Sequence, residues 1–364
     1  FPAIHGCPVH NISVTLETLP DLSNLESIWR TLATRAAHSV FQSWPWVHCW
    51  LDTPGVDPEL LIARDGDSVV GLALIQHSVQ HRRFMRIPTL HLQETGDAGI
   101  DSLFIEYNGF LSERACSEAV VAACLDFLIA QSDSWRELRL SGVSETFKTC
   151  AEQADAHCEI RSDQTSYFVD LDALRAQGRP YLNALSRNTR QHHNRSRRHI
   201  EKSGPLQLQR AGGISEALTY LEELKRLHQQ TWRLRGEPGA FGNPVFELFH
   251  QRLIETAFAE GLIDVLKFQV GDAPLGYLLN FVHDGTVYQY QSGFNGAYNR
   301  QRPGYIAHAA AIQYYLDAGM RVYNFMVGDN QQKSSLSTNT EQLFWLTLQR
   351  PNLGMRLENI LRSL

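Results

Sequence analysis

The sequence predicts an α+β (mixed α/β) protein made of two tandem copies of one domain, each a mostly antiparallel sheet flanked by helices. A chain of 364 residues with a hydrophobic content of 43% is long enough to bury two cores. Residues 263–327 read as three strands, a glycine-bearing loop, a helix and a strand. Residues 60–140 repeat this order, so we expect one domain over residues 1–165 and a second over 166–364.

The first domain opens with a predicted strand at 12–16 and a predicted helix at 22–37. The next segment, VFQSWPWVHCWL, holds an aromatic cluster of Phe41, Trp44, Trp46 and Trp50. Aromatic side chains bury large areas, so one interpretation places this cluster in the core. The other interpretation places it in the wall of a substrate cleft.

The repeat is clearest around two Gly-Asp turns, at Gly66 and Gly271, each of which lies between two apolar strands. A second glycine follows at the same spacing in both copies, at Gly71 and at Gly276. The first copy continues with a predicted strand at 104–108, a helix at 113–131 and a strand at 137–140.

The segment between the copies, residues 187–202, carries six basic side chains against one acidic side chain in a helix-compatible pattern. The basic residues are Arg187, Arg190, Arg195, Arg197, Arg198 and Lys202, and the acidic residue is Glu201. One interpretation is a solvated helix face. The other is an anion site, which leaves open the phosphates of a cofactor, an acidic acceptor or RNA.

The next predicted helix, residues 215–235, aligns Leu224, His228 and Trp232 on one face. A histidine at this position is either a hydrogen-bonded core residue or a general base, because its ordinary pKa lies near working pH. His250, in the segment FHQRL, is a second candidate for the base.

The loop before the last predicted helix leaves a helix start open to an anion. Residues 301–304 (QRPG) lead directly into a helix that Gly319 ends, and the first turn, 305–308, contains no Asp or Glu. A helix N-terminus offers unpaired N–H groups and a partial positive charge. We therefore expect an external anion to bind there.

This loop resembles the pyrophosphate loop of the GNAT-type acyl-CoA acyltransferases, whose pattern is Gln or Arg, two residues, Gly, one residue, then Gly or Ala. Gln301 and Gly304 fit the pattern, whereas Ile306 stands where Gly or Ala is usual. The resemblance implies acetyl-CoA or another acyl-CoA as co-substrate, and the absence of metal-ligand spacing predicts no metal. The binding residues that it implies are Gly293, Gln301, Arg302, Gly304, Tyr305 and Ile306.

Two broader resemblances cover more of the chain. The FQS-x-W segment and the basic segment are similar to those of the CelD/BcsL-like acyltransferases of cellulose biosynthesis. Tandem copies with one working cofactor site resemble the FemX-like branch of the superfamily. In the first copy, Ser112 and Glu113 place a hydroxyl and a carboxylate at the predicted helix start, so we expect that copy to be degenerate.

Acyl transfer from a thioester needs a base for the acceptor, donors for the oxyanion and an acid for the leaving sulfur. We expect His228 as the base, backbone N–H groups near Gly293 as the oxyanion donors and Tyr290 as the acid, in a direct transfer. The segment YNFMVGDNQQK resembles the family's ending, with Asn324 in place of an Asp and Gln332 in place of a Tyr. The expected substrate-binding residues are Trp232, His250, Asn324, Asp329 and Lys333.

The expected function is acyl transfer to an amino or hydroxyl group of a small molecule or saccharide. One alternative is a Fem-like aminoacyl-tRNA-dependent transferase, which would use the basic segment on tRNA. The other is a non-catalytic CoA-binding protein, which the departure at Ile306 suggests.

Composition restricts the partners and the location. A net charge of -6 argues against DNA binding, and the pair His192-His193 lacks the Cys or acidic neighbours of a metal site. Six cysteines without a CxxC pair predict reduced thiols in a cytoplasmic protein. We expect no membrane-spanning run, and the opening FPAIHGCPVH predicts a trimmed N-terminus without a secretion signal.

Overall fold

The computed structural model of the chain describes residues 11–82, 85–131 and 134–350, which form two compact units. Unit 2 is Gln164–Gln342, and unit 1 holds the described residues on either side of it. β7 (His157–Asp170) and β13 (Asn339–Gln349) each pass from one unit into the other. The described residues 343–350 therefore belong to unit 1, whereas the sequence-based division places them in the second domain.

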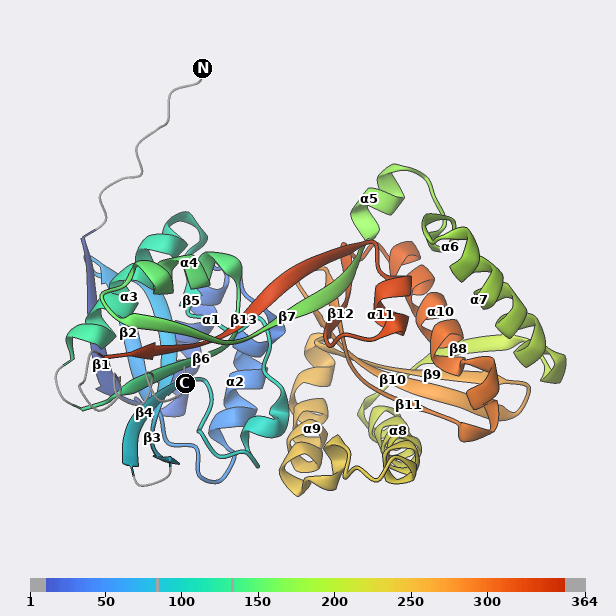
Figure 1. Ribbon diagram of the computed structural model, residues 1–364, viewed down its shortest axis with the longest axis horizontal. Helices are drawn as coiled ribbons and strands as arrows, with labels where there is room; N and C mark the ends of the chain where they lie inside the picture. Colours follow the sequence, from blue (N-terminus) through green and yellow to red (C-terminus); the bar gives the residue numbers. More distant parts are fainter. Residues whose placement is uncertain (1–10, 83–84, 132–133, 351–364) are drawn as a thin grey trace, which may run out of the picture. The chain divides into compact units, whose positions relative to one another are not determined.

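Unit 1 is a sheet with the strand order β1-β2-β3-β4-β6-β13, in which only the pair β4–β6 is parallel. Among its helices, α3 and α4 contribute most of the side chains to the core cluster of unit 1 (Figure 1). The strands are β1 (Ile12–Thr18), β2 (Glu59–Asp65), β3 (Ser68–Arg82), β4 (Met85–Leu92), β5 (Leu111–Ser112), which pairs with β3, and β6 (Glu137–Val143). The helices are α1 (Leu22–Ala33), α2 (Trp44–Leu51), α3 (Ser117–Ala130) and α4 (Glu145–Gln153).

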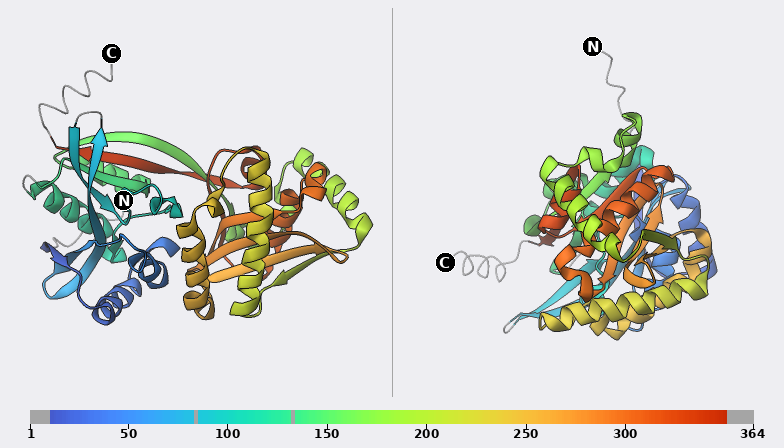
Figure 2. Two further views of the ribbon diagram at one scale, coloured as in Figure 1. Left: turned by 90° about the horizontal axis from the view of Figure 1, so that it is seen from below. Right: turned by 90° about the vertical axis from the view of Figure 1, so that its right-hand side faces the viewer.

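Unit 2 has the strand order β8-β9-β10-β11-β12-β7, in which only the pair β11–β12 is parallel. The strands are β8 (Leu206–Arg210), β9 (Ile263–Val270), β10 (Ala273–His283), β11 (Thr286–Phe294) and β12 (Val322–Val327). The helices are α5 (Leu171–Ala176), α6 (Tyr181–Ala184), α7 (Arg187–Ile200), α8 (Ile214–Leu234), α9 (Pro244–Ala257), α10 (Pro303–Asp317) and α11 (Gln331–Leu336). α8 and α9 cover one face of this sheet, and α7 and α10 cover the other (Figures 1 and 2).

The two units share one topology. Reading from β1 in unit 1 and from β8 in unit 2, each sheet has three antiparallel pairs, one parallel pair and a final antiparallel pair. The expected fold class, a mixed protein of two similar, mostly antiparallel sheets flanked by helices, is confirmed.

The prediction of a strand at 104–108 is wrong. These residues have irregular backbone, and Phe104 and Tyr107 adopt positive φ angles of 51° and 52°, outside the β region. The strand that follows β2 and β3 in this copy of the repeat is instead β4, and the helix expected from residue 113 begins at Ser117 after one 3-10 turn, Arg114–Cys116.

Local sequence explains the two helices of unit 2 that border the site. α10 begins at Pro303, whose fixed φ suits the first helical position, and stops before Gly319, which has a φ of 85°. α8 is amphipathic, with Leu221, Leu224 and His228 buried on the face toward the sheet.

The aromatic cluster of the first domain lies in the core, with Phe41 packed edge-on against Trp46 at a centroid distance of 4.8 Å. The five cysteines within the described residues are free thiols, and Cys7 lies outside them. Within the same ranges, no helix has both the length and the apolar character needed to cross a bilayer.

Candidate active site

The candidate site begins where two parallel strands of unit 2 separate. β11 and β12 are paired from Thr286–Val322 to Tyr288–Asn324, and the pairing ends there. A bulge in β12 follows, where its register with β7 shifts between Asn324 and Val327. At the bulge, Asn324 Oδ1 accepts hydrogen bonds from Met326 N at 2.6 Å and from Ser166 Oγ at 3.1 Å. Met326 has a φ of 63°, so the backbone of β12 turns away from β11 at this point.

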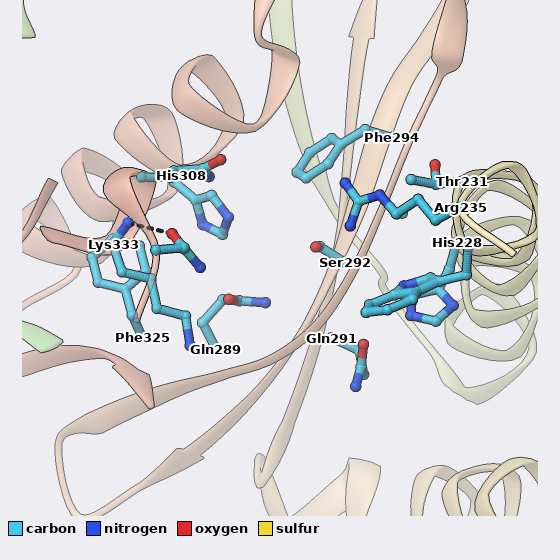
Figure 3. Close-up of a pocket in the computed structure, with 14 residues that line it drawn as sticks. His228, Thr231, Arg235, Gln289, Gln291, Ser292, Phe294, His308, Phe325 and Lys333 are labelled. Atoms are coloured by element: carbon cyan, nitrogen blue, oxygen red, sulfur yellow. Dashed lines mark hydrogen bonds between the residues drawn. The ribbon is translucent and has the colours of Figure 1, made fainter. Parts of the chain in front are cut away.

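A cavity of about 280 Å³, here called the β11–β12 cavity, opens beyond the last paired residues. Its cations are Arg235 and Lys333, and no carboxylate lines it. The lining comprises His228, Thr231, Trp232 and Arg235 from α8, Gln289 and Gln291–Phe294 from β11, and His308, Phe325, Asn330, Gln332 and Lys333 from the opposite wall (Figure 3). Within the described residues, no group of His, Cys, Asp and Glu is arranged to hold a metal.

The N-terminus of α10 lies at one end of this wall. Its N-cap residue, Arg302, has a φ of 51°, and its first turn contains no acidic residue, as the sequence predicts. The Gln332 amide lies directly over Gly304, since a Cβ there would come within 2.9 Å of Gln332 Nε2. The helix start therefore offers backbone N–H groups and a side-chain amide together, a combination that suits an anion.

The other residues of the expected cofactor loop have separate roles. Gln301 ends the 3-10 helix Gly296–Gln301, and its buried Oε1 has no hydrogen-bond partner in the described structure. Tyr305 directs its hydroxyl to Ser335 Oγ at 2.8 Å, so it ties α10 to α11. Ile306 is buried in the core of unit 2. Gly304, Tyr305 and Ile306 thus lie in one helical turn, and none of the three lines the β11–β12 cavity.

Gly293 sets the distance between β11 and α8. A Cβ at this position would come within 2.3 Å of Leu224 O and 3.1 Å of His228 N, so the two backbones are in contact. Only glycine permits this approach. The contact holds His228 beside the end of β11.

His228 is a neutral imidazole in the tautomer that a base requires. Gln229 Nε2 donates to Pro238 O at 2.8 Å, which turns Gln229 Oε1 toward His228 Nδ1 at 3.0 Å. Nδ1 therefore carries the hydrogen, and Nε2 keeps its lone pair. Burial, and to a lesser degree Arg235, lowers the pKa of His228. Trp232 and Phe241 flank the ring at centroid distances of 5.7 and 5.3 Å.

His308, on the opposite wall, has the other tautomer. Its Nδ1 lies 3.0 Å from the hydroxyl of Tyr323, a fully buried residue whose hydroxyl has no other hydrogen bond in the described structure. The buried phenol must donate this hydrogen bond, so His308 Nε2 carries the hydrogen. Burial, with a smaller effect of Lys333, lowers the pKa of His308 to about 3. The cavity thus contains one neutral imidazole that accepts and one that donates.

Two expected site residues, Tyr290 and His250, lie together in an aromatic cluster and not in the cavity lining. The Tyr290 ring packs against Phe281 at 4.8 Å and against His250 at 5.0 Å. His250 Nδ1 lies 2.6 Å from Phe246 O, and complete burial lowers the pKa of His250 to about 4. His250 belongs to α9 and Tyr290 to β11, so this pair lies where α9 packs on the sheet.

Of the other expected substrate-binding residues, two line the cavity and two lie outside its lining. Trp232 and Lys333 line the cavity. Asn324 is buried in the β12 bulge, and Asp329 accepts a hydrogen bond from Tyr167 Oη at 3.3 Å. Lys333 Nζ donates to Val327 O and, at 3.4 Å, to Met326 O, so this ammonium closes the end of β12.

Sequence analysis missed His308 and Arg235. His308 lies one turn after Gly304 on α10, and this spacing is the signal that would have found it. Arg235 follows the last residue of α8, three positions after Trp232, and therefore reaches the same wall.

The equivalent gap in unit 1 is filled by the chain itself. β4 and β6 are paired in parallel from Thr89–Glu137 to His91–Arg139. Beyond these pairs, Asn108 N donates to Gly142 O at 3.1 Å and Asn108 Nδ2 donates to Leu92 O at 2.9 Å. Asn108 thus joins the ends of the two strands.

The start of α3 in unit 1 is also occupied, but not as the sequence suggested. Ser112 Oγ lies 2.6 Å from Ser117 Oγ, the hydroxyl of the first residue of α3. Glu113 precedes the 3-10 turn and pairs with Arg35 at 3.2 Å, so the acid in the first turn of α3 is Glu118.

Comparisons with known proteins agree with this geometry. Residues 187–334 match the family model of the acetyltransferase (GNAT) domain. The fold is similar to the crystal structure of FemX (TM-score 0.62, 9% identity, 91% of this chain and 97% of that chain). It is also similar to L-PGS from Bacillus licheniformis (0.53, 10%, 95% and 97%). A further similar structure is the C-terminal domain of a putative lysylphosphatidylglycerol synthetase from Agrobacterium fabrum (0.54, 11%, 94% and 95%).

No curated protein sequence matches the chain. The matched residues run from the start of α7 into α11 and thus include the whole lining of the β11–β12 cavity. The chain is therefore a transferase that carries a GNAT-type acyltransferase domain in unit 2.

Proposed function

We propose that the chain is an acyl-CoA-dependent acyltransferase that transfers its acyl group directly, in a ternary complex, to an amino or hydroxyl group of a small molecule or saccharide. One observation carries this proposal: β11 and β12 separate beside a helix start that has no acid of its own. The separated strands expose backbone groups to a pantetheine arm, and the N-terminus of α10 attracts a pyrophosphate.

In this proposal, Gly304, the Gln332 amide and the N–H groups around Arg302 and Tyr305 bind the pyrophosphate of CoA. Backbone N–H groups of β11 near Gly293 stabilise the oxyanion. The cavity volume of about 280 Å³ suits the thioester end of the cofactor together with a small acceptor group.

His228 Nε2 removes the proton from the acceptor as its nitrogen or oxygen attacks the thioester carbonyl. The C–S bond then breaks, and His308 Nε2–H donates a hydrogen bond to the departing thiolate, which takes its proton from solvent. The sequence-based assignment gives the acid role to Tyr290. The position of Tyr290 outside the cavity lining favours His308 for this role.

Gly304 tests the cofactor site. In Gly304→Asp a carboxylate would face the phosphates, and we expect CoA affinity to fall more than tenfold, or about 1.4 kcal/mol, in calorimetry. Gly304→Asn is the matched control, because it displaces the Gln332 amide equally but adds no charge. Equal CoA affinities for the two folded variants would contradict the site.

A Fem-like aminoacyl-tRNA-dependent transferase is the second candidate, and the outer face of α7 favours it. Arg187, Arg195 and Arg198 are exposed there, and none pairs with a carboxylate in the described structure. Such a row of charges suits a phosphate backbone. Loss of activity on RNase treatment, with no response to acyl-CoA, would select this candidate.

The CelD/BcsL-like resemblance supports the small-molecule or saccharide acceptor, and the cysteine pattern supports a cytoplasmic location. Binding of acyl-CoA without turnover of any acceptor would indicate the remaining alternative, a non-catalytic CoA-binding protein.

A further inference from the structure

The α8 wall of the β11–β12 cavity carries a guanidinium without a counter-ion. Arg235 lies over the Trp232 ring, with Cζ 5.4 Å from the ring centroid. Within the described residues its guanidinium makes no ion pair and no hydrogen bond, whereas Arg226, earlier on the same helix, pairs with Glu223 at 2.8 Å. Figure 3 shows Arg235 extending from α8 across the cavity toward Ser292.

Nothing else in the lining neutralises this charge. The lining contains no Asp or Glu, and the second cation, Lys333, directs its ammonium to the carbonyls of Met326 and Val327. The two imidazoles of the cavity, His228 and His308, remain uncharged at neutral pH because burial lowers their pKa values. The cavity is therefore positive, and its most available donor is a planar guanidinium.

The geometry also orients Arg235 for recognition. The Trp232 ring supports one face of the guanidinium, which leaves the N–H groups at its edge for a ligand. A guanidinium binds a carboxylate or a phosphate through two parallel hydrogen bonds, which gives direction as well as affinity. Thr231 and Ser292 add hydroxyl groups beside it.

We propose that the acceptor carries a carboxylate or phosphate group that binds Arg235 while its amino or hydroxyl group faces His228. The substrate class is then a small anionic amine or alcohol. Both contact residues lie against the same indole ring, with the His228 ring 5.7 Å from it, so one small molecule spans them. This inference rests on the proposed acyl transfer and names the acceptor for the same cavity.

The competing source of the anion is CoA itself. The proposed pyrophosphate site is on the wall formed by α10 and α11, whereas Arg235 belongs to the α8 wall. The acceptor and CoA would both present an anionic oxygen group to Arg235. Calorimetry with CoA distinguishes them, because a change at Arg235 weakens CoA binding only if CoA is the ligand of Arg235.

The variants are Arg235→Gln and Arg235→Lys, with Arg226→Gln as the control from the same helix outside the cavity. Turnover is followed as thiol release from acetyl-CoA with matched acceptor pairs: ω-amino acids against their amides, and amino-sugar phosphates against the unphosphorylated sugars. We expect kcat/KM to be at least tenfold higher for the anionic member of a pair. Arg235→Gln should remove this preference and leave the Kd for CoA unchanged, whereas Arg226→Gln should change neither.

Three results would overturn the inference. One is equal kcat/KM for the anionic and neutral members in the unmodified protein, and another is a tenfold weaker Kd for CoA in Arg235→Gln. If no acceptor in the panel reacts, the binding of malonate and of inorganic phosphate to the CoA complex is measured by calorimetry instead. The third contrary result is that these anions bind the unmodified protein and Arg235→Gln with the same Kd. Failure of the unmodified protein to bind CoA is a different outcome, because it contradicts the proposed function itself.

Discussion

Two buried histidines of unit 2 differ in what they offer a ligand because each has a different neighbour. The Gln229 amide oxygen fixes the hydrogen of His228 on Nδ1, whereas the Tyr323 phenol fixes the hydrogen of His308 on Nε2. Both rings stay neutral, so the first can accept a proton and the second can donate a hydrogen bond. The division of roles comes from hydrogen bonds outside the cavity lining.

His228→Gln tests the base. Glutamine keeps a hydrogen-bonding side chain but cannot take the proton, so we expect kcat to fall about 100-fold or more while the melting temperature changes little. In the unmodified protein kcat should fall as pH drops below about 6.5, because protonation removes the base and burial places the pKa of His228 below the ordinary value. The variant should lose this limb of the pH profile.

His250→Gln is the matched control for this test, because His250 is buried outside the cavity lining. We expect it to melt earlier and to retain its kcat. A reversal of the two results, with a normal kcat for His228→Gln, would return His228 to a structural role.

His228 and Trp232 were expected from their helical spacing, and Lys333 from the resemblance of its segment to the family's ending; the structure places all three in the cavity lining. Tyr290 lies outside the lining that holds Gln289 and Gln291, because side chains alternate along a strand and the sequence does not tell which set faces a ligand. The sequence did not indicate Arg235, because a residue after the end of a helix has no periodic signal.

At the scale of the elements, the same pairing of strands gives an open gap in one unit and a filled gap in the other. β11 and β12 lose their pairing after Tyr288 and Asn324, and the β11–β12 cavity follows. In unit 1, Asn108 bridges β4 and β6 just beyond their last pair. A closed gap leaves no strand groups for a pantetheine arm.

We therefore expect one CoA molecule per chain, bound in unit 2. Calorimetry should give a stoichiometry near one, and a crystal soaked with CoA should show density near Gly304. Gly304→Asp should remove the site without exposing another. Density near Ser112, or a residual site in Gly304→Asp, would contradict the closure of unit 1 by Asn108.

The sequence predicted most elements because Gly-Asp turns mark the hairpins of both copies, at Gly66 and Gly271. It missed β4, whose Pro88 is unusual in a strand, and it read residues 104–108 as regular. The positive φ angles of Phe104 and Tyr107 have no sequence signal, because neither residue is a glycine.

At the scale of the whole molecule, each unit has its own core cluster, while β7 and β13 belong to both units. The sequence could not assign β13 to unit 1, since its pairing partner, β6, is far away in the chain. Separate cores allow the two units to open with different free energies. Their buried ionisable groups predict how these free energies change with pH.

In unit 2, burial lowers the pKa of His250 to about 4 and that of His308 to about 3. Between those values and the unfolded pKa of about 6.5, the unfolded state binds protons that the native state does not. The free energy of unfolding therefore falls as pH drops below about 6.5, by about 1.4 kcal/mol per pH unit for each histidine. Above this pH the two histidines contribute no further change.

In unit 1, two buried ionisable groups change the free energy of unfolding in opposite directions as pH falls. Burial, with Arg139 and Arg161, lowers the pKa of His91 to about 3, which again favours the native state at higher pH. Burial and Asp101 raise the pKa of Glu94 to about 7, so native Glu94 holds a proton that the unfolded chain releases above about pH 4.5. The contribution of Glu94 therefore raises the free energy of unfolding as pH falls. Between about pH 4.5 and 6.5 it offsets the contribution of His91, which lowers the free energy of unfolding as pH falls.

Acidification from pH 6.5 to 4.5 should consequently destabilise unit 2 and leave unit 1 nearly unchanged. Hydrogen exchange, corrected for the intrinsic effect of pH, measures this unit by unit, with β11 and α10 reporting on unit 2 and β3 and β6 on unit 1. Protection should fall in β11 and α10 only. In His308→Gln the unfolding of unit 2 should take up one proton fewer, because glutamine does not titrate. The free energy of unfolding of unit 2 should then change less steeply with pH, by about 1.4 kcal/mol per pH unit. Equal losses of protection in both units, or an unchanged slope in His308→Gln, would show that these buried histidines do not control the response to acid.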